Sequence, residues 1–458
     1  MNFTPSENVI GTIFRAYDIR GIFGKELTLD LAYKIGRAFA TKIGFGKKIS
    51  VSKDTRTSGN ALMESVILGL LDSGCTSIKI DTIPVPVLGY YVWSRNFDAG
   101  IYISASHNPP EYNGIRFRGK DGAGMLYKRL NIEEAIIKNQ FRELTKEEQK
   151  NVYSAESNVK AVVQEYCEFI SEKVSLDKNV RVILDPGNGS AYRMFPLYQK
   201  IGCETIGINV VPDGRFPDRM PEPKKETLEK TIKIVQDVKA DFGVAFDSDA
   251  DRGIIIDNNG EIVTPEKIAV LLVKKLGEGG KIVASMDCSL LLEKELGNLG
   301  YKIIREKVGD VFISQAVKRH KAIIGVERSG HFFIPKFHAS DDPFAMSSLL
   351  AEVLSETNKS LSQLANEIRE YPYYSENIPC PDNVKFDVME KIKEKFLKYE
   401  NWQVELKDGI RISTDDWAVL IRASHTEPKI RLYIETTVNN LNELTREFRE
   451  KLIRFISG

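Results

Sequence analysis

The sequence predicts an α/β protein built from several domains. Short β-branched runs alternate with amphipathic stretches along most of its 458 residues, a pattern typical of strands linked by crossover helices. Single hydrophobic cores stop growing beyond roughly 250–300 residues, so a chain of this length needs more than one. A content of 42% hydrophobic and 28% charged residues excludes a disordered polymer.

One αβ unit is clear between residues 224 and 246. Leu228, Ile232, Val235 and Val238 mark one face of a helix, and residues 242–246 form an apolar run of strand length. Similar units begin at residues 48–52, 180–184, 281–285 and 322–326. This recurrence predicts related αβ modules.

The last segment of the chain differs from the others. Strands are predicted at residues 409–413, 418–422 and 430–436, followed by a helix with Asn440 as its N-cap. We therefore expect a small α+β domain at the C-terminus. Charged or Tyr/Pro-rich stretches interrupt the pattern in three places, which predicts domains at residues 1–150, 151–258, 259–370 and 371–458.

The composition restricts the partners and the compartment. Lys plus Arg and Asp plus Glu both number 64, so no net field favours nucleic acid or a membrane surface. The five cysteines form no Cys-x-x-Cys pair and are expected to be buried thiols in a reducing compartment. No basic-then-apolar leader opens the sequence, and no apolar run approaches the roughly 20 residues of a membrane span. We expect a cytoplasmic monomer or small homo-oligomer that binds neither nucleic acid nor membrane.

Residues 100–110 form the first candidate site. A predicted strand runs into a loop that Pro109 and Pro110 keep from becoming a helix. The loop is expected to expose Ser104, Ser106 and His107. A simple polar turn is equally compatible with this pattern, and the Gly-x-Ser-x-Gly elbow of serine hydrolases is absent here.

Three aspartates at alternate positions form the second candidate site. Asp247, Asp249 and Asp251 follow directly on the apolar run 242–246. Carboxylates packed this closely raise one another's pKa values unless a cation is present. Hard divalent ions prefer oxygen ligands, and Mg²⁺ suits a site completed by phosphate and water. The pattern therefore favours a magnesium site over a solvated acidic turn.

Two further loops follow predicted strands. Residues 422–431 concentrate hydrogen-bond donors, and arginine forks suit phosphate oxygens, although a charged hairpin turn fits equally well. Residues 325–332 present Glu327, Ser329 and His331, which could hold sugar hydroxyls or form a capped turn.

Taken in order, these segments resemble the α-D-phosphohexomutase family, especially its phosphomannomutase/phosphoglucomutase branch. Residues 14–21 resemble the family's N-terminal substrate-phosphate motif, and residues 53–59 and 84–86 match further landmarks. The likeness spans nearly the whole chain. It implies four domains around a central cleft: three related αβ modules with mixed sheets, and a C-terminal α+β domain like the TATA-box-binding protein.

The resemblance also implies roles for individual residues. Ser106 would carry a phosphoryl group and, with Asp247, Asp249 and Asp251, would bind Mg²⁺. The other implied catalytic residues are His107, Arg116, Arg252 and Arg20. The implied substrate-binding residues are Tyr17, Lys307, Glu327, Ser329, His331, Arg422, Ser424, Thr426 and Arg431.

The implied reaction interconverts hexose 1-phosphate and hexose 6-phosphate, with mannose and/or glucose as the sugar. Phosphorylated Ser106 would give its group to a hexose monophosphate. The resulting hexose 1,6-bisphosphate, which also serves as activator, would turn over in the cleft and return its other phosphate. Metal and arginines would stabilise a transition state in which charge is spread over the phosphoryl oxygens.

The sequence departs from the family at two positions that bear on mechanism and substrate. Arg116 stands where the family usually has a lysine that moves protons, and arginine is a poor proton shuttle. We expect Arg116 to stabilise charge while Lys120, Lys307 or His331 moves protons, so that Arg116→Lys keeps or raises turnover. At Asp310 the sequence resembles phosphoglucosamine mutases. Phosphoglucosamine mutase activity is therefore the alternative to the expected activity on mannose or glucose phosphates.

Two other classes of protein stay open. An aspartyl-phosphate phosphatase also has Asp-x-Asp after a strand, although Asp251 replaces its usual Thr or Val. A non-catalytic sugar-phosphate binder is the second class. It is suggested by Arg116 and Asp310, because they replace family residues of the proton-transferring set.

Overall fold

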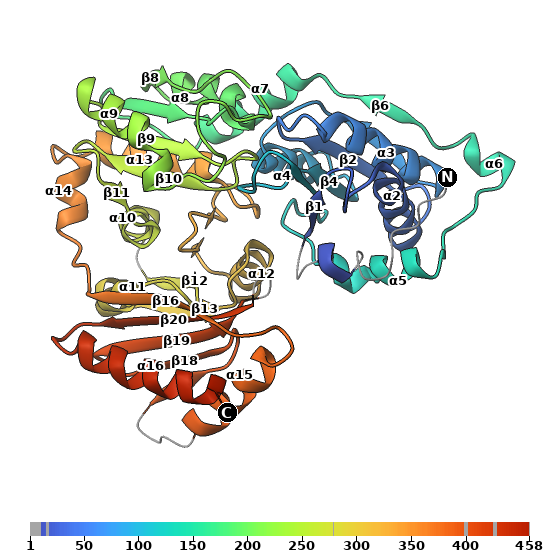
Figure 1. Cartoon of the computed structure of the whole chain (residues 1–458). Helices are drawn as coiled ribbons and strands as arrows, with labels where there is room; N and C mark the ends of the chain where they lie inside the picture. The colour runs from blue at the N-terminus through green and yellow to red at the C-terminus, as the bar shows by residue number, and fades with distance from the viewer. Residues whose placement is uncertain (1–10, 15–17, 278, 398–401, 425–427, 458) are drawn as a thin grey trace.

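The computed structural model describes residues 11–14, 18–277, 279–397, 402–424 and 428–457. It contains four separate sheets in chain order, three of them mixed and the last entirely antiparallel. Figure 1 shows the first sheet at upper right, the second at upper left, the third below it and the C-terminal sheet at the bottom. The predicted four-domain α/β class is confirmed.

The first sheet has the strand order β1-β5-β4-β2-β3-β6. Strand β4 runs parallel to β2 and antiparallel to β5, so the loop between β4 and β5 lies at the carboxyl end of the parallel strands. The elements are β1 (Ile19–Ile22), α2 (Leu29–Ile43), β2 (Lys48–Lys53), α3 (Gly59–Asp72), β3 (Thr76–Lys79), α4 (Val85–Ser94), β4 (Ala99–Ile103), β5 (Tyr112–Arg118), η1 (Tyr127–Leu130), α5 (Ile132–Ile137), α6 (Lys146–Gln149) and β6 (Ser154–Glu156).

The second sheet has the order β11-β10-β9-β7-β8. The apolar run predicted as a strand is β9, and the predicted helix before it is α9. Val235 of this helix and Leu228, its N-cap residue, are buried, and Ile232 is partly buried beside them. The elements are α7 (Val159–Ser171), β7 (Arg181–Asp185), η2 (Ser190–Arg193), α8 (Phe195–Lys200), β8 (Glu204–Gly207), η3 (Lys225–Thr227), α9 (Glu229–Asp237), β9 (Phe242–Phe246), β10 (Gly253–Asp257) and β11 (Ile262–Val263).

The third sheet has the order β13-β12-β14-β15. Its segment also supplies α13, which packs against β10 of the second sheet. The ring of Phe344 lies tilted against that of Phe246 at the end of β9, with 4.9 Å between ring centres. The elements are α10 (Pro265–Leu276), β12 (Gly280–Ser285), α11 (Leu291–Leu296), η4 (Gly297–Leu299), β13 (Tyr301–Glu306), α12 (Asp310–His320), β14 (Ile324–Val326), β15 (Phe332–Phe333), α13 (Pro343–Ser355) and α14 (Leu361–Asn366).

The fourth sheet has the order β16-β20-β19-β18-β17, and two helices cover one of its faces (Figure 1). The predicted C-terminal strands correspond to β18, β19 and β20, and the closing helix begins after Asn440 as predicted. The elements are β16 (Tyr373–Pro379), α15 (Lys385–Phe396), β17 (Gln403–Glu405), β18 (Ile410–Ser413), β19 (Trp417–Ala423), β20 (Lys429–Thr436) and α16 (Leu441–Ser457).

The apolar cores of the second and third domains are continuous with part of the first, whereas the core of the fourth domain is separate. One continuous apolar cluster joins α4 of the first domain to the interiors of the second and third domains, whereas the fourth domain has its own cluster. The predicted domain limits stay predictions; the first sheet takes in β6 and the second takes in β11, each just beyond the expected limit. Hydrogen bonds also connect the fourth domain to the third, from Ser289 and Leu290 to Glu435 and from Lys407 to the Arg305 carbonyl.

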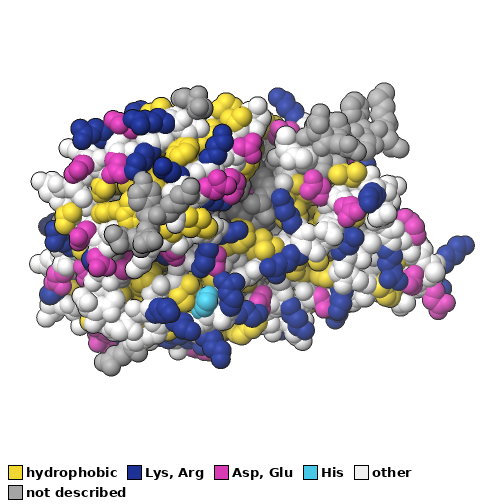
Figure 2. All heavy atoms as spheres, turned by 90° about the horizontal axis from the view of Figure 1, so that it is seen from below, with side chains coloured by type: hydrophobic (Ala, Val, Ile, Leu, Met, Phe, Trp, Pro, Cys, Tyr) yellow, Lys and Arg dark blue, Asp and Glu magenta, His cyan; other side chains and the backbone are white. Residues whose placement is uncertain are grey.

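Two predictions about the surface and the thiols can be compared with the structure. All five cysteines are free and buried, as expected. Basic and acidic side chains are interspersed on the face shown in Figure 2, in keeping with the zero net charge. Among the described residues, no helix has both the length and the apolar character to cross a membrane.

Candidate active site

Ser106 lies in the loop between β4 and β5. Its backbone φ of 51° is in the left-handed region, and its N–H donates to Ser104 Oγ at 2.8 Å. Its hydroxyl donates to Asp247 Oδ2 at 2.6 Å. The expectation that the loop exposes Ser104 and Ser106 is wrong, because both are buried by partners from distant segments. Ser106 nevertheless lines the central pocket.

Arg56 binds the backbone of the Ser106 loop. Its guanidinium donates to the carbonyl oxygens of Ser106, Asn108, Pro109 and Tyr112 at 2.6–2.9 Å. Its Nε also donates to Asp54 at 3.1 Å. One buried side chain therefore fixes four carbonyl groups of the loop that contains Ser106.

Asp54 is the acid that organises the same loop. Its Oδ2 accepts from Ser104 Oγ at 2.8 Å and from Ser248 Oγ at 2.9 Å. Ser248 in turn donates to the Ser106 carbonyl at 2.7 Å. Since Ser248 stands between two of the site's aspartates, Asp54 ties the serine loop to the aspartate loop.

The three aspartates lie in the loop between β9 and β10. Asp247, Asp249 and Asp251 are fully buried, and one carboxylate oxygen from each lies within 4.8 Å of the others. Burial and the neighbouring carboxylates raise the pKa of Asp247 well above its ordinary value. Asp249 Oδ1 is buried with no hydrogen-bond partner among the described residues. The group thus fits a divalent cation that takes oxygen ligands.

Arg116 on β5 supplies the positive charge that the aspartates face. It donates to Asp249 at 3.0 Å and to Asp310 at 2.7 Å, and it contacts Asp251 closely. Burial alone would lower the pKa of Arg116, but these carboxylates raise it well above its ordinary value. Arg116 therefore stays charged and joins three domains at one point.

The loop between β14 and β15 brings Glu327, Ser329 and His331 together. The His331 Nδ1 lies 2.9 Å from Glu327 Oε2 and from Ser329 Oγ, and its Nε2 lies 3.3 Å from Asp251. Burial alone would lower the pKa of His331, but Asp251 and Glu327 outweigh it and raise the pKa to about 10. The ring is therefore a cation in this site.

The donors predicted to grip a distal phosphate lie on β19 and β20. Arg422 and Arg431 are cross-strand neighbours, and Ser424 follows at the end of β19. All three line the pocket. Thr426 lies outside the described residues, as does Tyr17 of the first domain.

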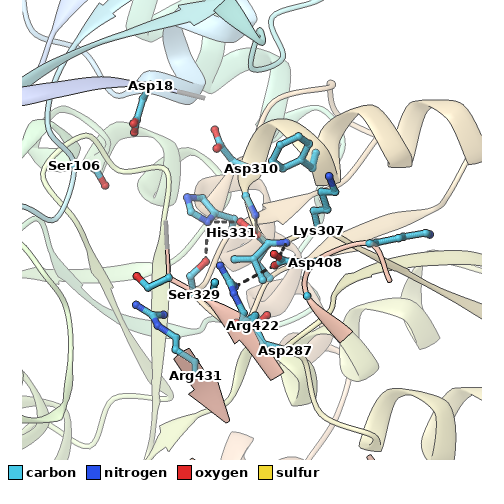
Figure 3. A pocket seen from close by; sticks show the side chains of 18 of the residues that line it. Asp18, Ser106, Asp287, Lys307, Asp310, Ser329, His331, Asp408, Arg422 and Arg431 are labelled. Carbon is cyan, nitrogen blue, oxygen red and sulfur yellow. Dashed lines mark hydrogen bonds and ion pairs between the residues drawn. The ribbon is translucent and has the colours of Figure 1, made fainter. Parts of the chain in front are cut away.

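One pocket of about 920 Å³ receives side chains from all four domains. Figure 3 shows Ser106 and Asp18 on one side of it and Arg422 and Arg431 on the other. The structure therefore brings nearly every described site residue into one cavity. Those that line it are Arg20, Ser106, His107, Arg116, Asp251, Arg252, Lys307, Glu327, Ser329, His331, Arg422, Ser424 and Arg431.

The remaining basic residues of the predicted site lie in different places. Arg20 donates to the Ala105 carbonyl at 3.1 Å and to Asn108 at 2.8 Å, beside the serine loop. Arg252, burial and Arg20 lower the pKa of His107, so this ring stays neutral. Lys120 is exposed and is not among the residues that line the pocket.

Sequence reasoning missed Asp54, Arg56, Asp341 and Asp408. Asp341 pairs with Arg118 at 2.9 Å beneath Arg116, and Asp408 lies 3.3 Å from Arg422. Only residues 53–59 carried a hint, because they matched a family landmark. No local pattern marks the other two.

The pocket gathers a serine, buried carboxylates and arginines from the four domains, and comparisons with known proteins identify the family. Residues 11–143, 164–260 and 264–371 match the alpha/beta/alpha domains I, II and III of phosphoglucomutase/phosphomannomutase, and residues 376–451 match its C-terminal domain. The chain belongs to this phosphohexomutase family, as the sequence predicted, and is a mutase of phosphorylated sugars.

Relatives and a solved structure match over almost the full length. A probable phosphoglucosamine mutase of Methanopyrus kandleri is 34% identical over 452 residues, covering 98% of both chains. One of Pyrococcus abyssi is 35% identical over 454 residues, covering 97% of this chain and 98% of the relative. The crystal structure of a phosphoglucomutase/phosphomannomutase family protein from Burkholderia thailandensis superposes with a TM-score of 0.87 at 27% identity, covering 97% of each chain.

Proposed function

We propose that the chain is a phosphoglucosamine mutase that interconverts glucosamine 1-phosphate and glucosamine 6-phosphate. The observation that carries the chemistry is the placement of Ser106 and the Arg422–Arg431 pair on opposite sides of one pocket. The choice of sugar rests on the names of the two relatives above. The sequence alone led us to expect mannose or glucose as the sugar. The relatives, which are named phosphoglucosamine mutases, favour glucosamine instead.

Phosphorylated Ser106 would donate its phosphoryl group to the free hydroxyl of a sugar monophosphate. The Ser Oγ–P bond breaks, a new O–P ester bond forms on the sugar, and the hydroxyl proton leaves to a neighbouring base. The product is a 1,6-bisphosphate. After it turns over, its other phosphate returns to Ser106, so the two transfers balance and the enzyme regains its phosphate.

The site also supports a role for Mg²⁺. Asp247, Asp249 and Asp251 would hold the ion, because Asp249 Oδ1 lacks a described partner and the pKa of Asp247 is raised by its neighbours. When bound, the ion would neutralise charge that develops on the phosphoryl oxygens. Arg20 and Arg252 line the same end of the pocket and would stabilise that charge as well.

Positioning would come from the far end of the pocket. Arg422, Ser424 and Arg431 would bind the phosphate that is not reacting, and Glu327 and Ser329 would bind sugar hydroxyls. Lys307 and His331 both line the pocket. The protonated ring of His331 could give a proton to the leaving oxygen, and Lys307 is the other group that could take part in proton transfer.

Intact-mass measurement with peptide mapping tests the covalent step. An adduct of roughly 80 Da on Ser106 is expected for one phosphate. It should resist hydroxylamine, whereas an adduct on Asp247 or Asp249 discharged by hydroxylamine would favour the aspartyl-phosphate phosphatase. Ser106→Ala should stay folded and lose activity by a factor on the order of 10⁴ or more.

Coupled assays with the 1-phosphates of glucosamine, glucose and mannose test the substrate. The highest kcat/KM is expected with glucosamine 1-phosphate. A preference for mannose or glucose would return the assignment to the other branch of the family. Tight binding without turnover of any of the three would favour a sugar-phosphate binder.

A further inference from the structure

Asp408 holds the guanidinium of Arg422 in a buried ion pair. Its Oδ2 lies 3.3 Å from Arg422 Nη1, and each residue is only 8% exposed. The same oxygen accepts a hydrogen bond from the Val308 N–H of the third domain at 3.3 Å. Figure 3 shows Asp408 beside Arg422 within the pocket. The carboxylate of Asp408 therefore occupies Arg422, and a phosphate that binds Arg422 would have to compete with it.

The backbone fixes Asp408 in this place. It lies in the turn between β17 and β18, where Gly409 has a φ of +75°. A Cβ on Gly409 would lie 2.2 Å from the Ile421 carbonyl oxygen, so only glycine lets the turn approach β19 this closely. Lys407 Nζ donates to the Arg305 carbonyl at 2.6 Å and anchors the turn on the third domain. The carboxylate is thus held by the fold.

The Val308 contact also links the phosphate end of the pocket to the sugar loop. The next residue, Gly309, donates its N–H to Glu327 Oε1 at 2.6 Å. Two consecutive backbone amides therefore bind one acid from the fourth domain and one acid from the sugar-binding loop. Asparagine at position 408 would retain an oxygen acceptor for Val308 while removing the charge.

We propose that Asp408 is a positioning residue whose carboxylate competes with the distal phosphate for the guanidinium of Arg422. This inference rests on the proposed function, in which the bisphosphate leaves the distal site and returns with its other phosphate once per cycle. Carboxylate and phosphate are alternative acceptors for a guanidinium. Each release would leave a buried cation uncompensated, which is costly, unless a second anion takes the place of the phosphate. Asp408 supplies that anion, so it weakens the grip on phosphate and speeds turnover of the intermediate.

The Asp408→Asn variant tests this exchange. Removal of the competing charge is expected to lower the Kd for inorganic phosphate and the KM for glucosamine 1-phosphate by about fivefold each. The kcat should fall by a similar factor, because tighter binding of the departing group slows a step that needs its release. If Asp408 only oriented Arg422, KM would rise instead. Glu376→Gln is the matched control, because Glu376 pairs with Arg449 in the same domain and does not line the pocket.

The outcomes separate this inference from the proposed function. The Kd for inorganic phosphate is measured by calorimetry and needs no turnover, so it tests the exchange even if the wild type isomerises none of the three sugars. Unchanged or weaker phosphate binding in Asp408→Asn, with a wild-type Tm, would overturn the exchange. Asp408→Glu should restore KM and kcat toward wild type. Loss of folding in both Asp408→Asn and Asp408→Ala would overturn it too, since the residue would then be purely structural.

Discussion

The guanidinium of Arg116 donates to the carboxylate of Asp310 across 2.7 Å, and through this bond the first domain reaches the third. The other guanidinium nitrogen donates to Asp249 of the second domain. A lysine at this position could release a proton, whereas the pKa of Arg116 is held far too high. The pair therefore makes Arg116 a fixed counter-charge at the junction of three domains.

Substitution of Arg116 should separate charge from proton transfer. Arg116→Lys keeps the positive charge, so kcat is expected to stay within about tenfold of wild type or to rise. Arg116→Gln leaves several buried carboxylates without their cation, so kcat should fall by about 10²–10³ and the Tm should drop. Steady-state kinetics and thermal unfolding check both. Complete inactivity of a folded Arg116→Lys enzyme would show that the guanidinium itself is required.

Replacing Asp249 should show through thermal stability whether the three aspartates bind Mg²⁺. Without metal, three buried carboxylates repel one another, so Asp249→Asn is expected to melt at or above the wild-type temperature in chelator. Adding Mg²⁺ should raise the Tm of the wild type and have little effect on the variant. Differential scanning calorimetry with and without chelator measures this. An equal shift in both proteins would place the ion elsewhere.

Glu266 on α10 provides a prediction about pH that is independent of the active site. Burial raises the pKa of this carboxyl, although its oxygen accepts from the Ser289 N–H at 2.9 Å. A raised pKa in the folded state means that stability is lost as pH rises through that value. Glu266→Gln should therefore increase the Tm by about 1–3 °C at pH 8 and have no effect near pH 4. The exposed Glu367→Gln serves as control, and a benefit that persists at pH 4 would contradict the assignment.

Local sequence signals located most of the secondary structure around the site. The run from Phe242 to Phe246 has the same limits as β9 because a continuous apolar stretch ends at an aspartate. The helix after Asn440 starts where its apolar stripe starts. In both cases the information lies within a few residues, so no tertiary contact is needed to find the element.

The errors in the site came from contacts between distant segments. Ser104 and Ser106 looked exposed because polar residues in a Pro-containing loop usually face water. Here Asp54, 50 residues before Ser104, and Asp247, 141 residues after Ser106, supply buried partners instead. Asp408 lies 100 residues from Val308, and no periodicity or motif connects them. Pairings of this kind depend on how the domains pack.

Arg56 is the residue of this kind whose replacement should be most informative. It does not line the pocket, yet it donates to four carbonyl oxygens of the serine loop and to Asp54. Lysine offers three donors from one atom and cannot span these acceptors, so several buried carbonyls would lose their partners. Arg56→Lys is expected to lower the Tm and to reduce kcat by about 10²-fold with KM nearly unchanged, because the distal clamp is untouched. Retention of full kcat would mean that the Ser106 loop keeps its shape without the guanidinium, since Arg56 reaches the chemistry only through that backbone.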